Sequence, residues 1–267
     1  TPHVGGPGRN RHDDIRREEL GLIEVRSHEW LGVVFVNIDG NAPAFEEANA
    51  ALIARWEEFD RPLHHGGPDS SFRLDVACNW KLAVENYCES YHLPWVHPGL
   101  NSYSRLEDHY HIEAPGRFSG QGTRAYRPML TEDGARFPVF ADLSDRWEEG
   151  AEYVALYPNV LLGIHKDHTF AMLLQPFGHD RTVERVGIWY AAAEVAGEAW
   201  AAMREGAVTL AQADYRAGRS GAVRRPRPVR RAAAASSCST RNRTMSRMSS
   251  TGRGSPSGNC TVPLPPR

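Results

Sequence analysis

Two histidines five positions apart carry the clearest chemical signal in this sequence. His92 and His97 lie in Glu-Ser-Tyr-His-Leu-Pro-Trp-Val-His-Pro, and Glu89 precedes the first of them by three residues. Pro94 disfavours helical backbone at the residue before it, so a helix that reaches this stretch should end near His92. The chain can then fold back, and both imidazoles can reach one metal ion.

The ligand types favour iron. Two imidazoles and a carboxylate that leave coordination positions open are typical of Fe(II) in oxygenases, and zinc is the alternative. The carboxylate could be Glu89 or a residue from a distant part of the chain. Cys88 is expected to pack as a small buried residue rather than to bind a metal. The competing interpretation of the histidine pair is two hydrogen-bonded core residues.

A helix predicted over residues 82–91 would position the motif. Glu89 and His92 lie three residues apart, so they would share one face of that helix. The apolar positions that recur at helical spacing on another face are Trp80, Val84, Tyr87 and Tyr91. A helix packed by this aromatic face would align the carboxylate with the imidazole.

The remaining elements predict an α+β fold with a mainly antiparallel sheet, because several strands are followed by one long alanine-rich helix. Residues 101–150 are polar and turn-rich and show no strong period. The predicted strands are 20–26, 30–38, 71–77, 153–162 with a turn at Pro158-Asn159, 168–174 and 183–191, and the other predicted helices are 45–59 and 198–216.

Composition excludes several classes of protein. The 267 residues allow one or two domains, and they contain no run of about 18 apolar residues that would span a membrane. The first residues lack the apolar core of a signal peptide, so we expect a cytoplasmic protein. Four cysteines without a CxxC pair, in a chain with no export signal, make a disulfide framework improbable.

The charge is distributed unevenly along the chain. Residues 218–267 hold 11 of the 31 Lys and Arg residues, none of the 33 Asp and Glu residues, and no aromatic residue. Two such different compositions suggest two origins for the two segments. A disordered basic tail is the simplest interpretation, although no specific nucleic-acid partner is predicted.

The residues around the histidine pair resemble those of a known family. Together they are similar to the iron motif of Rieske-type aromatic-ring-hydroxylating dioxygenase α subunits and of related monooxygenases acting on quaternary amines or salicylate-like acids. Further similarity at 30–37, 156–162 and 174–178 extends the resemblance over residues 1–217. The motif residues are Asn79, Trp80, Lys81, Glu85, Asn86, Glu89, His92, His97 and Pro98.

The resemblance implies a set of roles. His92, His97 and Asp214 would bind mononuclear Fe(II), with Asp214 placed by its position on the last predicted helix. Glu89 would bridge toward the Rieske 2Fe–2S cluster of a neighbouring subunit in a homotrimer. The implied fold is the helix-grip kind, like StAR-related and Bet v 1-like domains, with an antiparallel sheet and a long C-terminal helix. A reductase or ferredoxin would supply electrons.

The sequence departs from the family at both ends. A Rieske cluster needs two Cys and two His, and neither Cys-x-His nor Cys-x-x-His occurs here. We therefore expect residues 1–40 to be the remnant that follows a Rieske domain, 41–217 to be the catalytic domain and 218–267 to be a tail. A reading-frame error is our preferred explanation of the tail, because dropping one base from permitted codons restores the family's Val-Gln after the aspartate.

The expected function is the catalytic component of an oxygenase that hydroxylates an aromatic, quaternary-amine or other small organic substrate with O₂. The motif is common to ring dioxygenation, monohydroxylation and demethylation, so it leaves the substrate open. Without the cluster, the fragment alone is expected to be inactive. The alternatives are a redox-inactive domain that only binds a small molecule, and a zinc hydrolase.

Overall fold

A large antiparallel sheet forms the centre of the computed structural model, which describes residues 21–128, 135–209 and 212. Seven strands of this eight-stranded sheet follow the order β3-β10-β9-β8-β7-β6-β5, and β4 also pairs with β10. Strands β1 and β2 form a separate two-stranded sheet. Every pairing in both sheets is antiparallel.

The elements have the following bounds. The strands are β1 Arg26–Trp30, β2 Val33–Asn37, β3 His64–His65, β4 Ser71–Val76, β5 His109–Ala114, β6 Phe118–Thr123, β7 Ala151–Leu156, β8 Val160–Ile164, β9 His168–Pro176 and β10 Thr182–Tyr190. The helices are α1 Phe45–Ala48, α2 Ala50–Arg55, α3 Trp80–Cys88, α4 Leu93–Val96 and α5 Pro98–Tyr103, and residues 201–209 are also helical.

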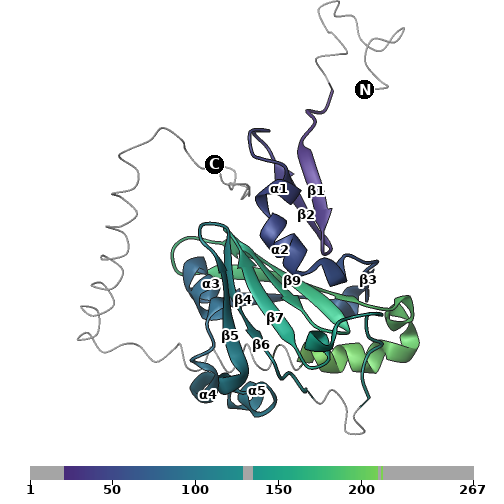
Figure 1. Ribbon diagram of the computed structural model, residues 1–267. Helices are drawn as coiled ribbons and strands as arrows, with labels where there is room; N and C mark the ends of the chain where they lie inside the picture. The colour runs from purple at the N-terminus through teal and green to yellow at the C-terminus, as the bar shows by residue number, and fades with distance from the viewer. Residues whose placement is uncertain (1–20, 129–134, 210–211, 213–267) are drawn as a thin grey trace, which may run out of the picture.

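The large sheet is covered on both faces. One face, here called the hairpin face, packs Val154 and Leu162 against Trp30 of the β1–β2 hairpin and Trp56. The opposite face, here called the helix face, packs Ala155 and other residues against α3, and Ile188 and Tyr190 against the helix at 201–209. In Figure 1 the hairpin with α1 and α2 lies above the sheet, and α4 and α5 lie beyond the ends of β5 and β6.

The predicted fold class is confirmed. The chain is α+β with an antiparallel sheet and helices on it, and the helix at 201–209 lies within the predicted C-terminal helix. Residues 198–200 form a 3₁₀ turn before it. Residues 210–211 and 213–216 of that predicted helix lie outside the described residues. The tail at 218–267 and residues 1–20 also lie outside them.

The prediction of one strand over residues 30–38 is wrong, because the chain turns inside it. Leu31 and Gly32 both have positive φ, 49° and 75°, which makes a tight hairpin turn between β1 and β2. A Cβ at Gly32 would lie 2.3 Å from the Trp189 ring, so the turn also requires the missing side chain. The strand predicted at 20–26 begins only at its last residue, Arg26.

Strands β5 and β6 lie in the region where no period was found. Gly120 and Gly122 weaken the strand signal of β6, since glycine has low strand propensity. Their role is to admit close neighbours, because a Cβ at Gly122 would lie 2.3 Å from the Tyr110 ring.

The helix predicted at 45–59 is also broken at Asn49 into α1 and α2.

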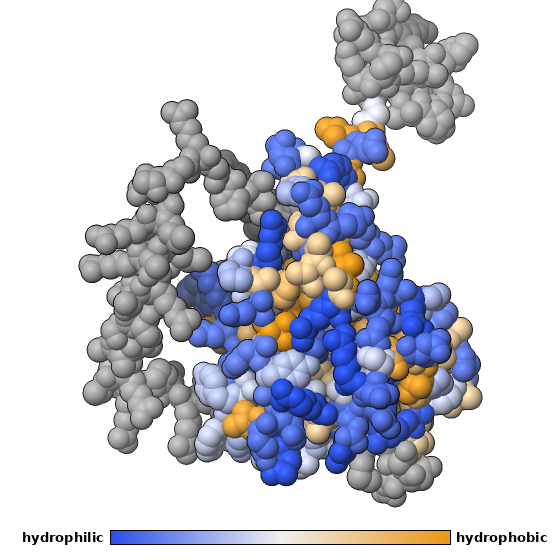
Figure 2. All heavy atoms as spheres, in the orientation of Figure 1, coloured by the Kyte–Doolittle hydropathy of each residue, from blue (hydrophilic) through white to orange (hydrophobic). Residues whose placement is uncertain are grey.

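The visible surface is mainly hydrophilic, with small apolar patches (Figure 2). Within the described ranges, no helix combines the length and the apolar character needed to cross a bilayer.

A buried carboxylate ties α2 to the hairpin face of the sheet. Glu152 of β7 is 1% exposed and accepts hydrogen bonds from Arg55 at 2.7 and 2.8 Å. Its oxygens also accept from the indole Nε1 of Trp56 at 2.6 Å and from the Tyr110 hydroxyl at 2.7 Å. A carboxylate with this many donors in an apolar setting is stabilising only while every partner is present.

Replacing Glu152 by Ala should therefore destabilise the fold. The substitution leaves one guanidinium and two neutral donors without their acceptor, at a cost of about 3 kcal/mol. Urea denaturation of wild type and Glu152→Ala measures the difference. Glu149→Ala is the control, because the Glu149–Arg127 pair is exposed and its loss should leave the unfolding midpoint unchanged. Equal midpoints for Glu152→Ala and wild type would contradict this role.

Candidate metal centre

Helix α3 brings the motif to the helix face of the sheet. Asn79 caps its first turn by accepting a hydrogen bond from the backbone of Lys81 at 3.1 Å. Val84 and Tyr87 pack on the sheet as their spacing predicts, whereas Tyr91 is 68% exposed. The prediction that Tyr91 continues the packed face is wrong, because the helix has already ended at Cys88.

The end of α3 differs from the prediction in a second way. Glu89 has extended backbone, with φ −124° and ψ 156°, so it does not share a helical face with His92. Pro94 lies in the first turn of α4 and begins that helix instead of ending α3. Proline is tolerated there because the first amides of a helix have no intrahelical partner. His92 and His97 consequently flank the single turn of α4.

The two imidazoles lie close together, edge to face, across this turn. Their ring centroids are 5.1 Å apart, with an interplanar angle of 69°. His97 is 8% exposed, and the side chain of His92 is 12% exposed. In zinc sites the imidazole nitrogen lies about 2.1 Å from the ion, which puts the centroids of two rings on one ion about 5 Å apart. The pair therefore fits a shared metal ion.

Glu89 contacts His92 despite the break in the helix. Its carboxylate lies within hydrogen-bonding distance of His92 Nδ1 and also accepts from the His92 backbone amide at 3.3 Å. A carboxylate accepts from Nδ1–H, which leaves Nε2 as the nitrogen through which His92 would bind a metal. This is the usual way in which an outer carboxylate orients a ligating imidazole.

The described residues hold two of the three predicted ligands. Asp214 lies outside them, and within the described ranges no group of three His, Cys, Asp or Glu residues could hold a metal ion. Cys88 takes the packing role predicted for it, since it lies against the helix-face core. Burial raises the pKa of the Cys88 thiol, which disfavours the thiolate needed for metal binding.

An aromatic group lies on the same face of the sheet as α3. The Tyr153 ring is 6.2 Å from Tyr87 and 5.4 Å from His165, and His165 also contacts Tyr126 and Phe170. Burial lowers the pKa of His165 well below its ordinary value, so the ring is neutral at physiological pH. Sequence reasoning missed this group, because its members come from β7, β9 and the turns beside them.

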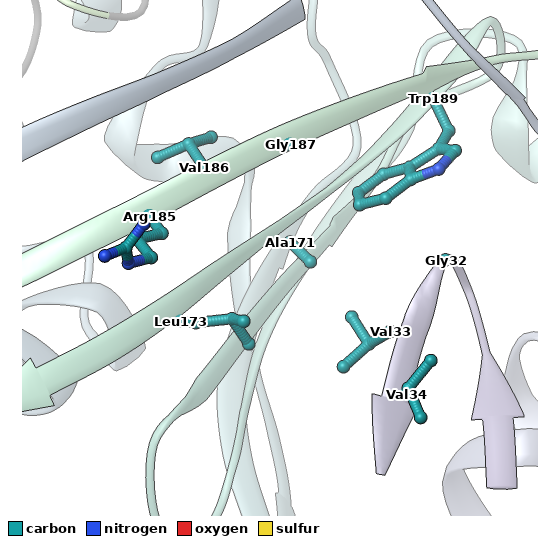
Figure 3. Close-up of a pocket in the computed structure, with 9 residues that line it drawn as sticks. All are labelled: Gly32, Val33, Val34, Ala171, Leu173, Arg185, Val186, Gly187 and Trp189. Atoms are coloured by element: carbon teal, nitrogen blue, oxygen red, sulfur yellow. The ribbon is translucent and has the colours of Figure 1, made fainter. Parts of the chain in front are cut away.

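The cavity in Figure 3 is a separate feature. It has a volume of about 310 Å³ and lies between the β1–β2 hairpin and strands β9 and β10. Its walls include Val33 and Trp189, which belong to the hairpin-face core or pack against it. The histidine pair follows α3 on the other face, so this cavity is not the candidate metal centre.

A histidine pair beside a sheet that packs against helices defines a candidate metal-binding domain of the helix-grip kind. Residues 63–219 match the family model described as the ring hydroxylating alpha subunit, catalytic domain. This match covers more than half of the chain, and the chain belongs to that family.

The curated relatives are named as monooxygenases or as their oxygenase subunits. The carnitine monooxygenase oxygenase subunit of Escherichia coli (strain K12) is 33% identical over 94 residues, which are 35% of this chain and 25% of that protein. Choline monooxygenase, chloroplastic, of Arabidopsis thaliana is 26% identical over 171 residues, which are 60% of this chain and 38% of that protein. The matched regions thus span well under two thirds of these relatives.

Solved structures share the fold. A quaternary ammonium Rieske monooxygenase in complex with L-carnitine has a TM-score of 0.57 and 16% identity, with 80% of this chain and 55% of that chain covered. Naphthalene 1,2-dioxygenase with indole bound in the active site also has a TM-score of 0.57 and 16% identity, with 78% and 56% covered. These likenesses support the helix-grip architecture.

Removing either imidazole should abolish metal binding. His92→Ala and His97→Ala each leave too few ligands to hold a divalent ion, so titration with Co(II) or Fe(II) under argon should detect no binding. His179→Ala is the matched control, because His179 has a 93% exposed side chain and lies far along the chain from the pair. Full metal content in the His92→Ala protein would exclude this assignment.

Proposed function

We propose that this chain is the catalytic domain of a Rieske-type non-haem iron oxygenase, with His92 and His97 as iron ligands and Asp214 as the third ligand. The observation that carries the proposal is the close, edge-to-face histidine pair with Glu89 on the Nδ1 side of His92, in a chain of the ring-hydroxylating family. Two imidazoles and one carboxylate are the ligand set typical of non-haem Fe(II) oxygenases. The bound iron would supply the chemistry of O₂ activation.

The chain's own residues have distinct tasks in this proposal. The imidazoles of His92 and His97 donate their ring nitrogens and leave the other coordination positions open. Glu89 fixes the tautomer of His92 through Nδ1. The 8% exposure of His97 keeps bulk water away from one side of the pair.

Electrons would enter from another subunit. In this proposal Glu89 links the iron to the 2Fe–2S cluster of a neighbouring Rieske domain, and a ferredoxin or reductase reduces that cluster. Tyr91 and Trp95 support a protein partner here, since they flank His92 and are 68% and 78% exposed. Large exposed aromatic residues beside a site mark protein interfaces. A homotrimer would place a neighbouring subunit over this edge.

We further propose a quaternary ammonium compound as the substrate class. The curated relatives include monooxygenases named for carnitine, choline and glycine betaine. The aromatic group around Tyr153 supplies ring faces that attract such cations without a hydrogen bond. The neutral state of His165 suits this role, because a charged imidazole would repel the substrate.

The division of the chain remains part of the proposal. Residues 1–40 would form the connection from the Rieske domain and 41–217 the catalytic domain, while 218–267 would be a tail outside it. The β1–β2 hairpin, which is part of this proposed connection, shares the hairpin-face core with the large sheet.

Glu89→Gln should separate electron transfer from metal binding. In a protein that joins this chain to a Rieske domain, the variant should retain iron and cluster but lose most of its turnover. The amide can still contact His92, whereas it lacks the charge of the carboxylate. Iron analysis, cluster absorption and O₂ uptake measure the three properties. Glu113→Gln is the control, because Glu113 is an exposed acid on β5 outside the motif, and turnover of Glu89→Gln equal to that of Glu113→Gln would exclude the role.

Tyr153→Leu should weaken the recognition of a quaternary ammonium substrate. Loss of one ring face should raise KM about tenfold, which corresponds to roughly 1–2 kcal/mol of cation–π attraction. The measurement uses a protein that joins this chain to a Rieske domain. The KM of Tyr153→Leu for carnitine, choline or glycine betaine, whichever is turned over, is compared with that of wild type, and Tyr157→Leu is the control, because Tyr157 is 38% exposed. Turnover of neutral aromatic compounds alone would rule out the substrate class and leave the oxygenase proposal intact.

A further inference from the structure

We propose that Gln121 is the positioning residue of the metal centre. Together with His109 and Ser104 it forms a hydrogen-bonded chain, here called the Gln121 relay, that fixes both ends of the segment carrying His92 and His97. The inference rests on the proposed function, because it concerns the geometry of the proposed iron ligands.

One end of the relay holds the end of α3. Gln121 lies on β6 and is 7% exposed. Its Nε2 donates to the backbone oxygen of Tyr87 at 3.1 Å and to that of Glu89 at 2.9 Å. The last carbonyls of a helix have no intrahelical partner, and buried ones must be satisfied by another group. The two amide hydrogens of one side chain therefore fix the point at which the helix stops.

The other end holds the chain beyond His97. Gln121 Oε1 lies 2.8 Å from His109 Nδ1, and His109 Nε2 lies 3.0 Å from the Ser104 hydroxyl oxygen. Ser104 directly follows α5 and is 1% exposed. The segment between Glu89 and Ser104 contains both candidate ligands, so the relay holds it on each side.

The polarity of the relay has one consistent direction. Gln121 Nε2 donates to the two carbonyls, so its Oε1 must be the acceptor and His109 Nδ1–H the donor to it. In the neutral ring, the Ser104 hydroxyl then donates to His109 Nε2. Burial lowers the pKa of His109, which favours the neutral ring that this order requires. A neutral imidazole has one donor and one acceptor nitrogen, and both are used here.

The relay is anchored on a rigid support. Gln121 pairs with His111 of β5 on one side and with Tyr153 of β7 on the other, so its backbone is held within the sheet. The segment from Glu89 to Ser104 has only the short helices α4 and α5. Short helices are marginal alone, so the spacing of the imidazoles depends on outer contacts of this kind.

Gln121→Glu tests the relay with little change of volume. The carboxylate can still accept from His109, but it cannot donate to the Tyr87 and Glu89 carbonyls. Co(II) binding should weaken 10–100-fold, the range typical of lost outer contacts to metal ligands, and the visible spectrum of bound Co(II) should change. Hydrogen exchange should accelerate in residues 89–104 of the metal-free protein while strands β9 and β10 keep their protection.

The matched control is Gln175→Glu. Gln175 lies on β9 of the same sheet and accepts from Arg185 at 2.8 Å, which a carboxylate can also do. Its Co(II) affinity should equal that of wild type. Ser104→Ala is a second, milder variant that removes the hydroxyl at the far end, and it should weaken Co(II) binding about fivefold, as expected for one lost hydrogen bond.

The outcomes separate the relay from the proposed function. Wild type that binds no Co(II), or His92→Ala that binds it as tightly as wild type, would overturn both. Binding that is lost in His92→Ala but unchanged in Gln121→Glu and Ser104→Ala would overturn the relay alone. A lower melting temperature with wild-type Co(II) affinity would assign Gln121 a merely structural role and would also overturn it.

Discussion

The structure depends on one sheet that must be buried on both faces. Alternate residues of a strand point to opposite faces, so each strand serves two environments at once. In β7, Val154 belongs to the hairpin-face core, whereas Ala155 belongs to the helix-face core. In β6, Phe118 packs on the hairpin face while Gln121 reaches the end of α3. The same strands therefore stabilise the fold and carry the site.

The buried polar groups have different roles on the two faces of the sheet. On the hairpin face, the Glu152 carboxylate accepts hydrogen bonds from three side chains and so joins α2 to the sheet. On the helix face, the Glu89 carboxylate contacts His92 Nδ1, and the Gln121 amide donates to the backbone at the end of α3. The contact at Nδ1 leaves Nε2 of His92 as the nitrogen for a ligand. The Glu152 contacts and the proposed metal centre therefore lie on opposite faces of the same sheet.

The break in the helix brings the two histidine rings close enough for one metal ion to reach both. Residues five apart on a continuous helix point in directions well over 90° apart, so one ion could not reach both rings. Here the extended residue Glu89 and the single turn of α4 replace the helix, and the ring centroids come within 5.1 Å. Exposed Tyr91 and Trp95 are a consequence of the same break, since their segment has left the packed face.

The sequence by itself determined the class of the fold, the motif and the chemistry of its side chains. Residue type and spacing are local properties, so the pair His92 and His97, the acid Glu89 and strands such as β4 and β10 could be predicted. Strands β5 and β6 could not, because β6 contains Gly120 and Gly122, and their close neighbours, the Tyr153 backbone and the Tyr110 ring, are known only from the folded sheet.

The tertiary structure alone decided where the helix ends and what holds the site. Pro94 predicts a boundary but does not say whether one helix stops or another starts, because proline fits the first turn of a helix. Gln121 and His109 have no motif, and they reach the site only because β5 and β6 pair beside α3. Hydrogen bonds between residues more than 30 positions apart require the folded sheet, which no local pattern records.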